Sequence, residues 1–452
     1  MTLTGRRATS PGRMRSTRLR HTVARSLQIA LAAGIAAAVC VRELVRRRAQ
    51  PLRARVPAAI GYACVGLATR LGATFIKVGQ IASTRADLLP PALVAELARL
   101  RDQVPPFPFA TVRATVEQAL GRPLDAVFSA FESVPVAAAS VAQVHRAVVR
   151  DSGETVAVKV RRPDILEKVR LDRAILLAIG RGLERLVPSL RLISLHEALA
   201  AFCTAVEAQI HLGNEARNNE RFRRDFAGDD DVRFPRLVPA LCTDEVLVME
   251  FVDGVREEDL ERHGLDVRRI VDAGMRCVCR MVFTHGFVHA DLHPGNMRFL
   301  APGRIVLFDL GLVGELTEQD RLTAVELFYA LATGDGATVA RLFYVNAPHH
   351  AVRDYAAYEQ EIRVYCDSIR ARGLDQMEVT VEIGRIFDIL RRHRIQARSH
   401  MTMVNLALAT AEGLGKRLAP DLSLADEALP YLAEALGIPA PPRLERREAI
   451  GA

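Results

Sequence analysis

The chain has 452 residues, of which 50% are hydrophobic and 25% are charged. This length suggests two or three structural units, and the composition excludes a mostly disordered chain, a collagen and a polytopic membrane protein. The seven cysteines form no CxxC pair. We therefore expect neither a zinc site nor a disulfide framework, and we expect the cysteines to be small buried apolar residues in a reducing compartment.

The net charge of +8 is concentrated at the N-terminus. Residues 1–55 contain thirteen Arg, one Glu and neither Lys nor Asp, so they carry +12 and the rest of the chain carries −4. Nucleic-acid binding would need a basic face with interleaved aromatic residues on a folded domain. Aromatic residues make up only 5% of the chain, with no Trp, so we expect no nucleic-acid partner.

An apolar run lies inside this basic tail. From Leu27 to Val41 every residue is apolar or small except Gln28. Fifteen helical residues span about 22 Å, which is less than the ~30 Å of a bilayer core. Because arginines stand on both sides, we expect a helix that lies on an anionic membrane surface, at its cytoplasmic face. The alternatives are a short spanning anchor, a cleaved signal peptide and a helix packed on the body.

The predicted elements of the first half are helices followed by strands. Apolar residues at three- and four-residue spacing predict helices over 58–71, 92–100 and 110–120, separated by proline-rich loops. Short β-branched runs over 141–149 and 155–160 flank Asp151-Ser152-Gly153 and predict a β-hairpin. A helical pattern follows over 164–226, and 246–251 is a further predicted strand.

The second half is predicted to be mostly helical. We predict a buried helix over 267–284, a polar loop over 285–297, a strand over 304–308, helices from 317 to 438 and a frayed tail. This order favours an α+β, two-lobed body. We divide the chain into a basic tail (1–55), a helical extension (56–130), an N-terminal lobe (131–255), a helical C-terminal lobe (256–438) and a flexible tail (439–452).

The sharpest chemical pattern lies around the predicted polar loop. Asp291 and Asn296 are five residues apart after a helix, and Asp309 follows at the end of a strand. Kinase-type phosphoryl transfer needs one Asp to orient the nucleophile, and an Asn and a second Asp to hold Mg²⁺. Carboxylate and amide oxygens are hard ligands that suit Mg²⁺. We therefore predict that Asp291 is the catalytic base or orients the attacking water, that Asn296 is a catalytic residue and metal ligand, and that Asp309 is a metal ligand.

Other residues fit the nucleotide of such a site. Lys159 lies on a strand in a Val-Ala-Val-Lys setting, typical of the catalytic lysine that pairs with the α- and β-phosphates. Glu215 on a later helix is its predicted partner. Where a glycine-rich phosphate loop is expected, the chain has Ala137, Ala138, Ala139 and Ser140, and alanine resists positive φ. The adenine is expected against the strand around Met249, Glu250 and Val252.

Together these residues resemble the UbiB/AarF family of atypical kinase-like ATPases, over about residues 65–425. The family's marks are Lys77-x-Gly79-Gln80, Ser83 to Pro90, Ala137 to Ser140, and Val288 to Asn296. The resemblance implies a kinase-like fold, ATP or ADP with Mg²⁺, and a role in ubiquinone-type biosynthesis with quinone-pathway proteins or quinone precursors as partners. It also implies that Lys77 and Gln80 belong to a regulatory extension that covers the place where a protein substrate enters an ordinary kinase.

The chain departs from the family in two places. The magnesium motif reads Asp309-Leu310-Gly311, with Leu where Phe is commoner. The acidic E-x-D pair that precedes the helix Glu is replaced by Gln209 and His211, so the partner of Lys77 is missing or displaced. Glu207, on the same predicted helix as His211, could replace the lost acid, and His211 could pair with Glu207 four residues earlier.

Three functions remain open on this basis. The first is a membrane-associated, Mg²⁺-dependent ATPase or phosphotransferase, which the intact Asp291 favours. The second is a catalytically silent scaffold that binds nucleotide and lipid and organises quinone-pathway enzymes, which the altered extension favours. The third is a small-molecule phosphotransferase of the aminoglycoside type, which has a similar catalytic loop but lacks the K-x-G-Q extension.

Overall fold

The computed structural model describes residues 11–83, 89–100, 105–186, 195–372, 379–419 and 423–439, so the predicted tail after residue 439 lies outside the described residues. Two compact units divide the chain. The first takes in the chain up to Gly153, with Val158–His211 and Thr243–Val246. The second takes in Glu154–Ala157, Leu212–Cys242 and the chain from Leu247 on.

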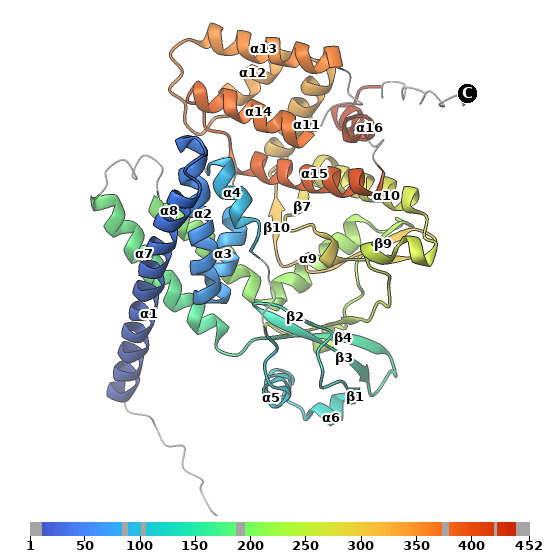
Figure 1. Ribbon diagram of the computed structural model, residues 1–452. Coiled ribbons are helices and arrows are strands. Elements are labelled where there is room, and N and C mark those ends of the chain that lie inside the picture. Colours follow the sequence, from blue (N-terminus) through green and yellow to red (C-terminus); the bar gives the residue numbers. More distant parts are fainter. Residues whose placement is uncertain are drawn as a thin grey trace, which may run out of the picture. The chain divides into compact units, whose positions relative to one another are not determined.

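The first unit opens with four helices that lie side by side (Figure 1). They are α1 (Pro11–Arg46), α2 (Leu52–Leu71), α3 (Ala73–Ser83) and α4 (Pro91–Leu97). Their apolar faces meet in one cluster, to which α1 contributes Ile29 and Ala32. The helices predicted over 58–71 and 92–100 are confirmed, whereas α1 is much longer than the apolar run that predicted it.

Helix α1 has two unlike faces. Ile29, Ala32 and Glu43 are buried, and α1 packs along α2. The other face is apolar and exposed: its side chains include those of Leu27, Leu31, Ile35, Val41 and Val45. The segment Ala24–Arg46 is long and apolar enough to cross a membrane by length and composition, and only 11% of its most apolar window is buried. The packed-helix alternative is thus confirmed for one face only.

Two polar contacts fasten α1 to its neighbours. Arg25 binds the fully buried carboxylate of Asp172 in α7 (Ile165–Leu186) through two nitrogens, at 2.7 and 2.9 Å. Directly after α1, Arg47 binds Glu96 of α4 at 2.7 Å and also contacts the buried Glu43 of α1. The helix is therefore attached at both ends of its apolar segment.

A five-stranded sheet follows α5 (Phe109–Leu120) and α6 (Leu124–Val127). Its order is β1-β3-β4-β6, with β2 beside β3; the strands are β1 (Phe128–Phe131), β2 (Ala137–Ala138), β3 (Ala142–Val149), β4 (Thr155–Arg161) and β6 (Val246–Glu250). The predicted hairpin is confirmed as β3 and β4. Gly153 in its turn has φ +69°, which explains the glycine at this position.

Helical hairpin α7–α8 completes the first unit. Helix α8 spans Leu195–Ile210, and its buried Val206 and Ile210 pack with Ile165 and Val169 of α7. Helix α9 (Leu212–Asp225) is a separate element that begins the second unit. The single helical pattern predicted over 164–226 is therefore three helices.

The core of the second unit surrounds helix α10 (Val267–Cys279) and the π-helical turn Arg280–Thr284 that continues it. Cys277 and Cys279 of α10 are buried in this core, and burial raises the pKa of both thiols. All seven cysteines are free; the expected burial is confirmed for Cys203, Cys277, Cys279 and Cys366, whereas Cys40, Cys64 and Cys242 are only partly buried. Short strands follow: β7 (Phe287–His289), β8 (Met297–Leu300), β9 (Arg304–Leu307) and β10 (Val313–Glu315); β5 (Val232–Arg233) joins β9 and β8 in one sheet.

Six helices end the described chain, as predicted from 317 to 438. They are α11 (Glu318–Thr333), α12 (Gly336–Val345), α13 (Tyr355–Arg372), α14 (Val379–Arg392), α15 (Ser399–Leu418) and α16 (Leu424–Leu436). Their apolar residues pack into the same core as α10. The predicted α+β class with a helix-rich C-terminal part is confirmed.

Candidate functional site

The predicted site residues fall into both units. The second unit holds Asp291, Asn296, Asp309 and Glu215, together with Met249 and Glu250 of β6 and Val252, which lies two residues after the strand. The first unit holds Lys159, the loop Ala137–Ser140, Lys77 and Gln80.

The loop that carries Asp291 begins at a short strand that the sequence did not predict. Strand β7 pairs antiparallel with β10, so that His289 lies opposite Val313. One residue farther on, the N–H of Ala290 donates to the carbonyl of Leu312 at 3.1 Å. The residues before Asp291 are therefore held against the residues that follow Asp309.

His289 joins the two halves of this site. Its ring is fully buried; Nδ1 accepts from the N–H of Asp291 at 3.1 Å, and Nε2 donates to the carbonyl of Phe308 at 3.2 Å. Burial lowers the pKa of His289, which favours the neutral ring that this pair of contacts requires. Because Phe308 precedes Asp309, one histidine fixes the backbone at both carboxylates.

Asn296 also makes hydrogen bonds to the backbone near both carboxylates, at Asp291 and at Phe308. Its Nδ2 donates to the carbonyl of Asp291 at 3.2 Å, and its own carbonyl accepts from the N–H of Phe308 at 2.9 Å. Since the amide nitrogen is used as a donor inside the protein, Oδ1 is the atom suited to a metal. Hydrogen bonds of Asn296 therefore link Asp291 to Phe308, the residue before Asp309.

Asp309 adopts a backbone conformation that few side chains tolerate. Its φ is +54°, in the left-handed region, where Asp and Asn are the commonest residues after Gly. Gly311 lies beside two carboxylates: a Cβ built on it would be 3.6 Å from Oδ1 of Asp309 and 3.7 Å from Oε2 of Glu215. The buried Glu215 of α9 thus approaches the metal motif. Asn218, one turn along α9, donates to the carbonyl of Leu310 at 2.8 Å and holds α9 to this loop.

These donors fit a magnesium–nucleotide complex better than a metal held by protein alone. Within the described residues, no three or more His, Cys, Asp or Glu side chains converge as a metal site. Mg²⁺ in nucleotide sites commonly takes one or two protein oxygens and completes its shell with phosphates and water. Asp309 and Asn296 offer this kind of set.

On the strand predicted to face the adenine, the side chains of Met249 and Glu250 contact other parts of the protein. Met249 is buried with Leu212, Leu237 and Leu247 in an apolar cluster. The carboxylate of Glu250 accepts from Arg233 at 2.6 Å and from the N–H of Arg236 at 3.0 Å. The side chains of Met249 and Glu250 are therefore engaged inside the protein, and the N–H of Glu250 donates to the carbonyl of Arg236 at 2.8 Å.

In the first unit, the alanine-rich loop is a narrow turn. Ala137 and Ala138 form β2 and pair with Val144 and Gln143 of β3, and the N–H of Ala139 donates to the carbonyl of Ala142 at 2.8 Å. Ser140 is buried. Residues 137–140 do not occur among the described non-glycine residues with positive φ, so this turn needs no glycine. Lys159 lies half-buried on β4.

Helix α3 carries the extension motif. Lys77 is buried, with 8% of its surface exposed. Gln80 donates through Nε2 to the carbonyl of Leu100 at 3.4 Å. A Cβ on Gly79 would lie 2.3 Å from Cδ1 of Leu100, so the glycine allows α3 to approach this side chain closely.

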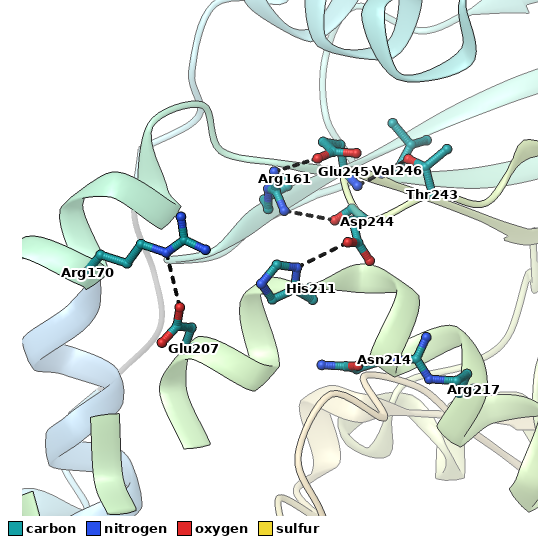
Figure 2. A network of polar contacts seen from close by, with 10 residues as sticks. All are labelled: Arg161, Arg170, Glu207, His211, Asn214, Arg217, Thr243, Asp244, Glu245 and Val246. Atoms are coloured by element: carbon teal, nitrogen blue, oxygen red, sulfur yellow. Dashed lines mark hydrogen bonds and ion pairs between the residues drawn. The ribbon is translucent and has the colours of Figure 1, made fainter. Parts of the chain in front are cut away.

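The residues that replace the family's acidic pair do not act as the sequence suggested (Figure 2). Helix α8 ends at Ile210, so His211 lies outside it and cannot make a helical contact to Glu207. His211 instead contacts Asp244 through Nδ1 at 3.3 Å. Glu207 accepts from Arg170 and Arg173 of α7 at 3.2 and 3.5 Å. The prediction that Glu207 pairs with His211 is therefore wrong, and Glu207 already has partners other than Lys77.

Two residues of the site escaped the sequence reading. His289 lies inside the motif Val288 to Asn296 but was given no role, and Asn218 stands three residues after Glu215 on the same helix face. Both act on backbone carbonyls, of Phe308 and Leu310, which have no side-chain signature. The available signal was their closeness in sequence to Asp291 and Glu215.

Comparisons with known proteins agree with this geometry. Residues 99–343 match a family model for the ABC1 atypical kinase-like domain, and residues 362–423 match one for the UbiB helical domain. A probable protein kinase UbiB from Erwinia tasmaniensis is 32% identical over 412 residues, which are 88% of this chain and 74% of that protein. The solved complex of Rv3197 with erythromycin from Mycobacterium tuberculosis has a TM-score of 0.53 and 20% identity, over 79% of this chain and 91% of that chain. The last similarity concerns the fold alone.

Proposed function

We propose that this chain, which belongs to the UbiB family of atypical kinase-like proteins, is a membrane-associated, Mg²⁺-dependent ATP-binding protein with ATPase or phosphotransferase activity. The observation that carries the proposal is the framework in which His289 and Asn296 fix the backbone of Asp291 to the residue before Asp309. The resemblance to UbiB proteins supports a role in isoprenoid-quinone biosynthesis, with quinone precursors or pathway proteins as partners.

Each residue has a distinct role in this proposal. Asp309 and Asn296 hold Mg²⁺, which neutralises charge on the phosphates. Lys159 binds the α- and β-phosphates, and Glu215 orients Lys159. Asp291 accepts the proton of the attacking hydroxyl or orients the attacking water. The alanine-rich loop covers the phosphates.

A nucleotide-binding scaffold without turnover is the second candidate. It is favoured by the neutral Gln209 and by His211, which contacts Asp244, because both replace acids of the family's regulatory contact. The two candidates share nucleotide binding and differ in phosphate release.

Nucleotide binding is tested by the melting temperature. MgADP or MgATP is expected to raise it, because a ligand at about 100 times its Kd stabilises the folded state by about 2.7 kcal/mol. Asp309→Asn keeps the size of the side chain and its tolerance of positive φ but removes the charge, so it should abolish the magnesium-dependent part of the shift. Asp367→Asn, on the exposed surface of α13, is the control and should leave the shift intact. A wild-type protein with no shift at millimolar nucleotide would contradict the proposal.

Membrane association is tested on the exposed face of α1. Changing Leu27, Leu31 and Val45 to Gln should weaken binding to anionic vesicles by at least about tenfold, since burying one leucine side chain contributes ~1.5–3 kcal/mol. Binding should also weaken with salt if the arginines contribute. Substitution is preferable to deletion of the chain through Arg47, which would also remove Arg25, the partner of Asp172, and Arg47, a partner of Glu96.

The matched control changes three exposed valines outside α1, Val134, Val345 and Val364, to Gln. Vesicle binding should be unchanged in this variant. Equal binding by the α1 variant and the wild type in a sedimentation assay would rule out α1 as the lipid-facing surface.

A further inference from the structure

Arg162, directly after β4 and three residues beyond Lys159, reaches the alanine-rich loop through two hydrogen bonds. Its backbone N–H donates to the carbonyl of Val141 at 2.8 Å, and its Nε donates to the carbonyl of Ala139 at 2.9 Å. Both acceptors belong to the turn that the bond from Ala139 to Ala142 closes. The turn is thus stabilised by a hydrogen bond within its own backbone and by a hydrogen bond from the guanidinium of Arg162.

The guanidinium of Arg162 also contacts the helical extension, at Pro105 and Phe107. Nη2 of Arg162 donates to the carbonyl of Pro105 at 2.8 Å, and the group stacks over the ring of Phe107, 5.3 Å from its centroid. A planar guanidinium can make these contacts at once because its donors point in fixed directions, which a lysine ammonium cannot reproduce. Arg162 therefore bridges the phosphate loop and the Pro105–Phe107 segment of the extension.

Gln143 of β3 fastens that segment a second time. Its Oε1 accepts from the N–H of Phe107 at 2.9 Å, and its Nε2 donates to the carbonyl of Phe107 at 3.3 Å. Nε2 also contacts Nε2 of His145 at 2.9 Å, and Nδ1 of His145 contacts the carbonyl of Glu132 at 2.8 Å. Both side chains are buried, and burial lowers the pKa of His145, so the ring is neutral with its proton on Nδ1. Gln143 pairs with Ala138 of the loop. Its contacts to Phe107 therefore start from the strand position opposite the residue before Ala139.

From these contacts we infer that Arg162 is a positioning residue for the phosphate loop, and that Arg162 with Gln143 couples the shape of this loop to the Pro105–Phe107 segment of the extension. The inference rests on the proposed nucleotide site and adds a regulatory link to it. Glycines make the backbone of an ordinary phosphate loop flexible. In this loop the backbone conformation is instead held by the hydrogen bonds of Arg162. A change in the extension that moves Pro105 would loosen the turn over the phosphates.

The chain offers a matched control in the neighbouring arginine. Arg161 also donates from the end of β4, to the carbonyl of Asp244 at 3.1 Å and to the carboxylate of Glu245 at 2.8 Å (Figure 2). These contacts lie on the side of β6, whereas the contacts of Arg162 lie on the loop and the extension. Arg161→Met and Arg162→Met remove the same charge and the same number of atoms from adjacent positions.

The experiment measures the Kd of MgADP and of adenosine for the full chain by calorimetry, well below the melting temperature. Arg162→Met should raise the Kd of MgADP about tenfold, as expected for the loss of hydrogen bonds from a charged donor, and leave the Kd of adenosine unchanged. Arg162→Lys should restore part of the loss, and Gln143→Leu should weaken MgADP binding by less. Arg161→Met should leave both constants unchanged.

Hydrogen exchange of the nucleotide-free protein gives a second readout that does not depend on the proposed function. Arg162→Met should speed exchange of the amides of Val136 and Ala139, which bond within the β2–β3 turn, and Arg161→Met should not. If the wild type binds no nucleotide, the proposed function fails. Hydrogen exchange at Val136 and Ala139 still tests whether Arg162 holds the alanine-rich loop. Equal losses of MgADP and adenosine affinity, or unchanged exchange at Val136 and Ala139 in Arg162→Met, would overturn the inference.

Discussion

Asp291→Asn is expected to lower the rate of phosphate release from MgATP by about 10²–10⁴-fold, the usual contribution of a positioned general base. The backbone of Asp291 is fixed on both sides, by His289 at its N–H and by Asn296 at its carbonyl. The amide of Asn occupies the same volume and cannot accept the proton. The loss should therefore fall on turnover, while the Kd of MgADP stays unchanged.

The measurement is phosphate release by purified protein, with and without anionic vesicles and a quinone-precursor-like phenol. Asp367→Asn, a carboxylate of equal chemistry on the surface of α13, should release phosphate at the wild-type rate. If Asp291→Asn were as active as this control, Asp291 would not be the base. If the wild type bound nucleotide and released no phosphate under any of these conditions, the scaffold would be the better description.

Arg25→Met is expected to destabilise the first unit by about 3–5 kcal/mol, the usual cost of removing one partner of a buried ion pair. The carboxylate of Asp172 is fully buried, and Arg25 is 17% exposed and binds both of its oxygens. Arg25 also donates to the carbonyl of Leu71 at the end of α2 at 2.8 Å. Without the guanidinium, the carboxylate of Asp172 is left in an apolar environment and α1 loses its attachment to α7.

Unfolding in urea followed by helical circular dichroism measures this effect. Arg70→Met is the control, because Arg70 is exposed and donates only within its own helix, to the carbonyl of Gly66. Its cost should stay within about 0.5 kcal/mol. The double variant Arg25→Met/Asp172→Leu should regain part of the loss, since the buried charge is removed together with its partner. A cost of Arg25→Met no larger than that of Arg70→Met would show that the pair does not hold α1.

The site could be predicted where its chemistry is carried by side chains at fixed spacing in one loop. Asp291, Asn296 and Asp309 are such residues, and in the structure Asn296 is hydrogen-bonded both to Asp291 and to Phe308, the neighbour of Asp309. His289 was read as part of a polar loop because a three-residue strand is too short to show a period of two. Its burial comes from pairing with β10, a contact that no local pattern encodes.

The boundaries that the sequence missed have tertiary causes as well. The apolar periodicity from 164 to 226 continues through His211, so it indicated one long helical region. The helix nevertheless ends at Ile210, and the side chain of His211 contacts Asp244, which is far away in sequence. Likewise, the arginine run of the tail predicted a lipid-facing segment but not that Arg25 binds Asp172. The long-range partner of a single charged residue cannot be predicted from sequence periodicity, because one residue forms no repeating pattern.

The positive φ of Asp309 limits how the proposed metal site can be lost in descendants of this chain. A single nucleotide change in an aspartate codon can produce Asn, Gly, Ala, Val, Glu, His or Tyr. Of these, Gly adopts this backbone freely and Asn tolerates it well, whereas β-branched Val is strongly disfavoured there. Lineages that abandon metal binding yet keep the fold are thus expected to carry Asn or Gly at position 309, and a branched aliphatic residue there would indicate that the loop itself has been rebuilt.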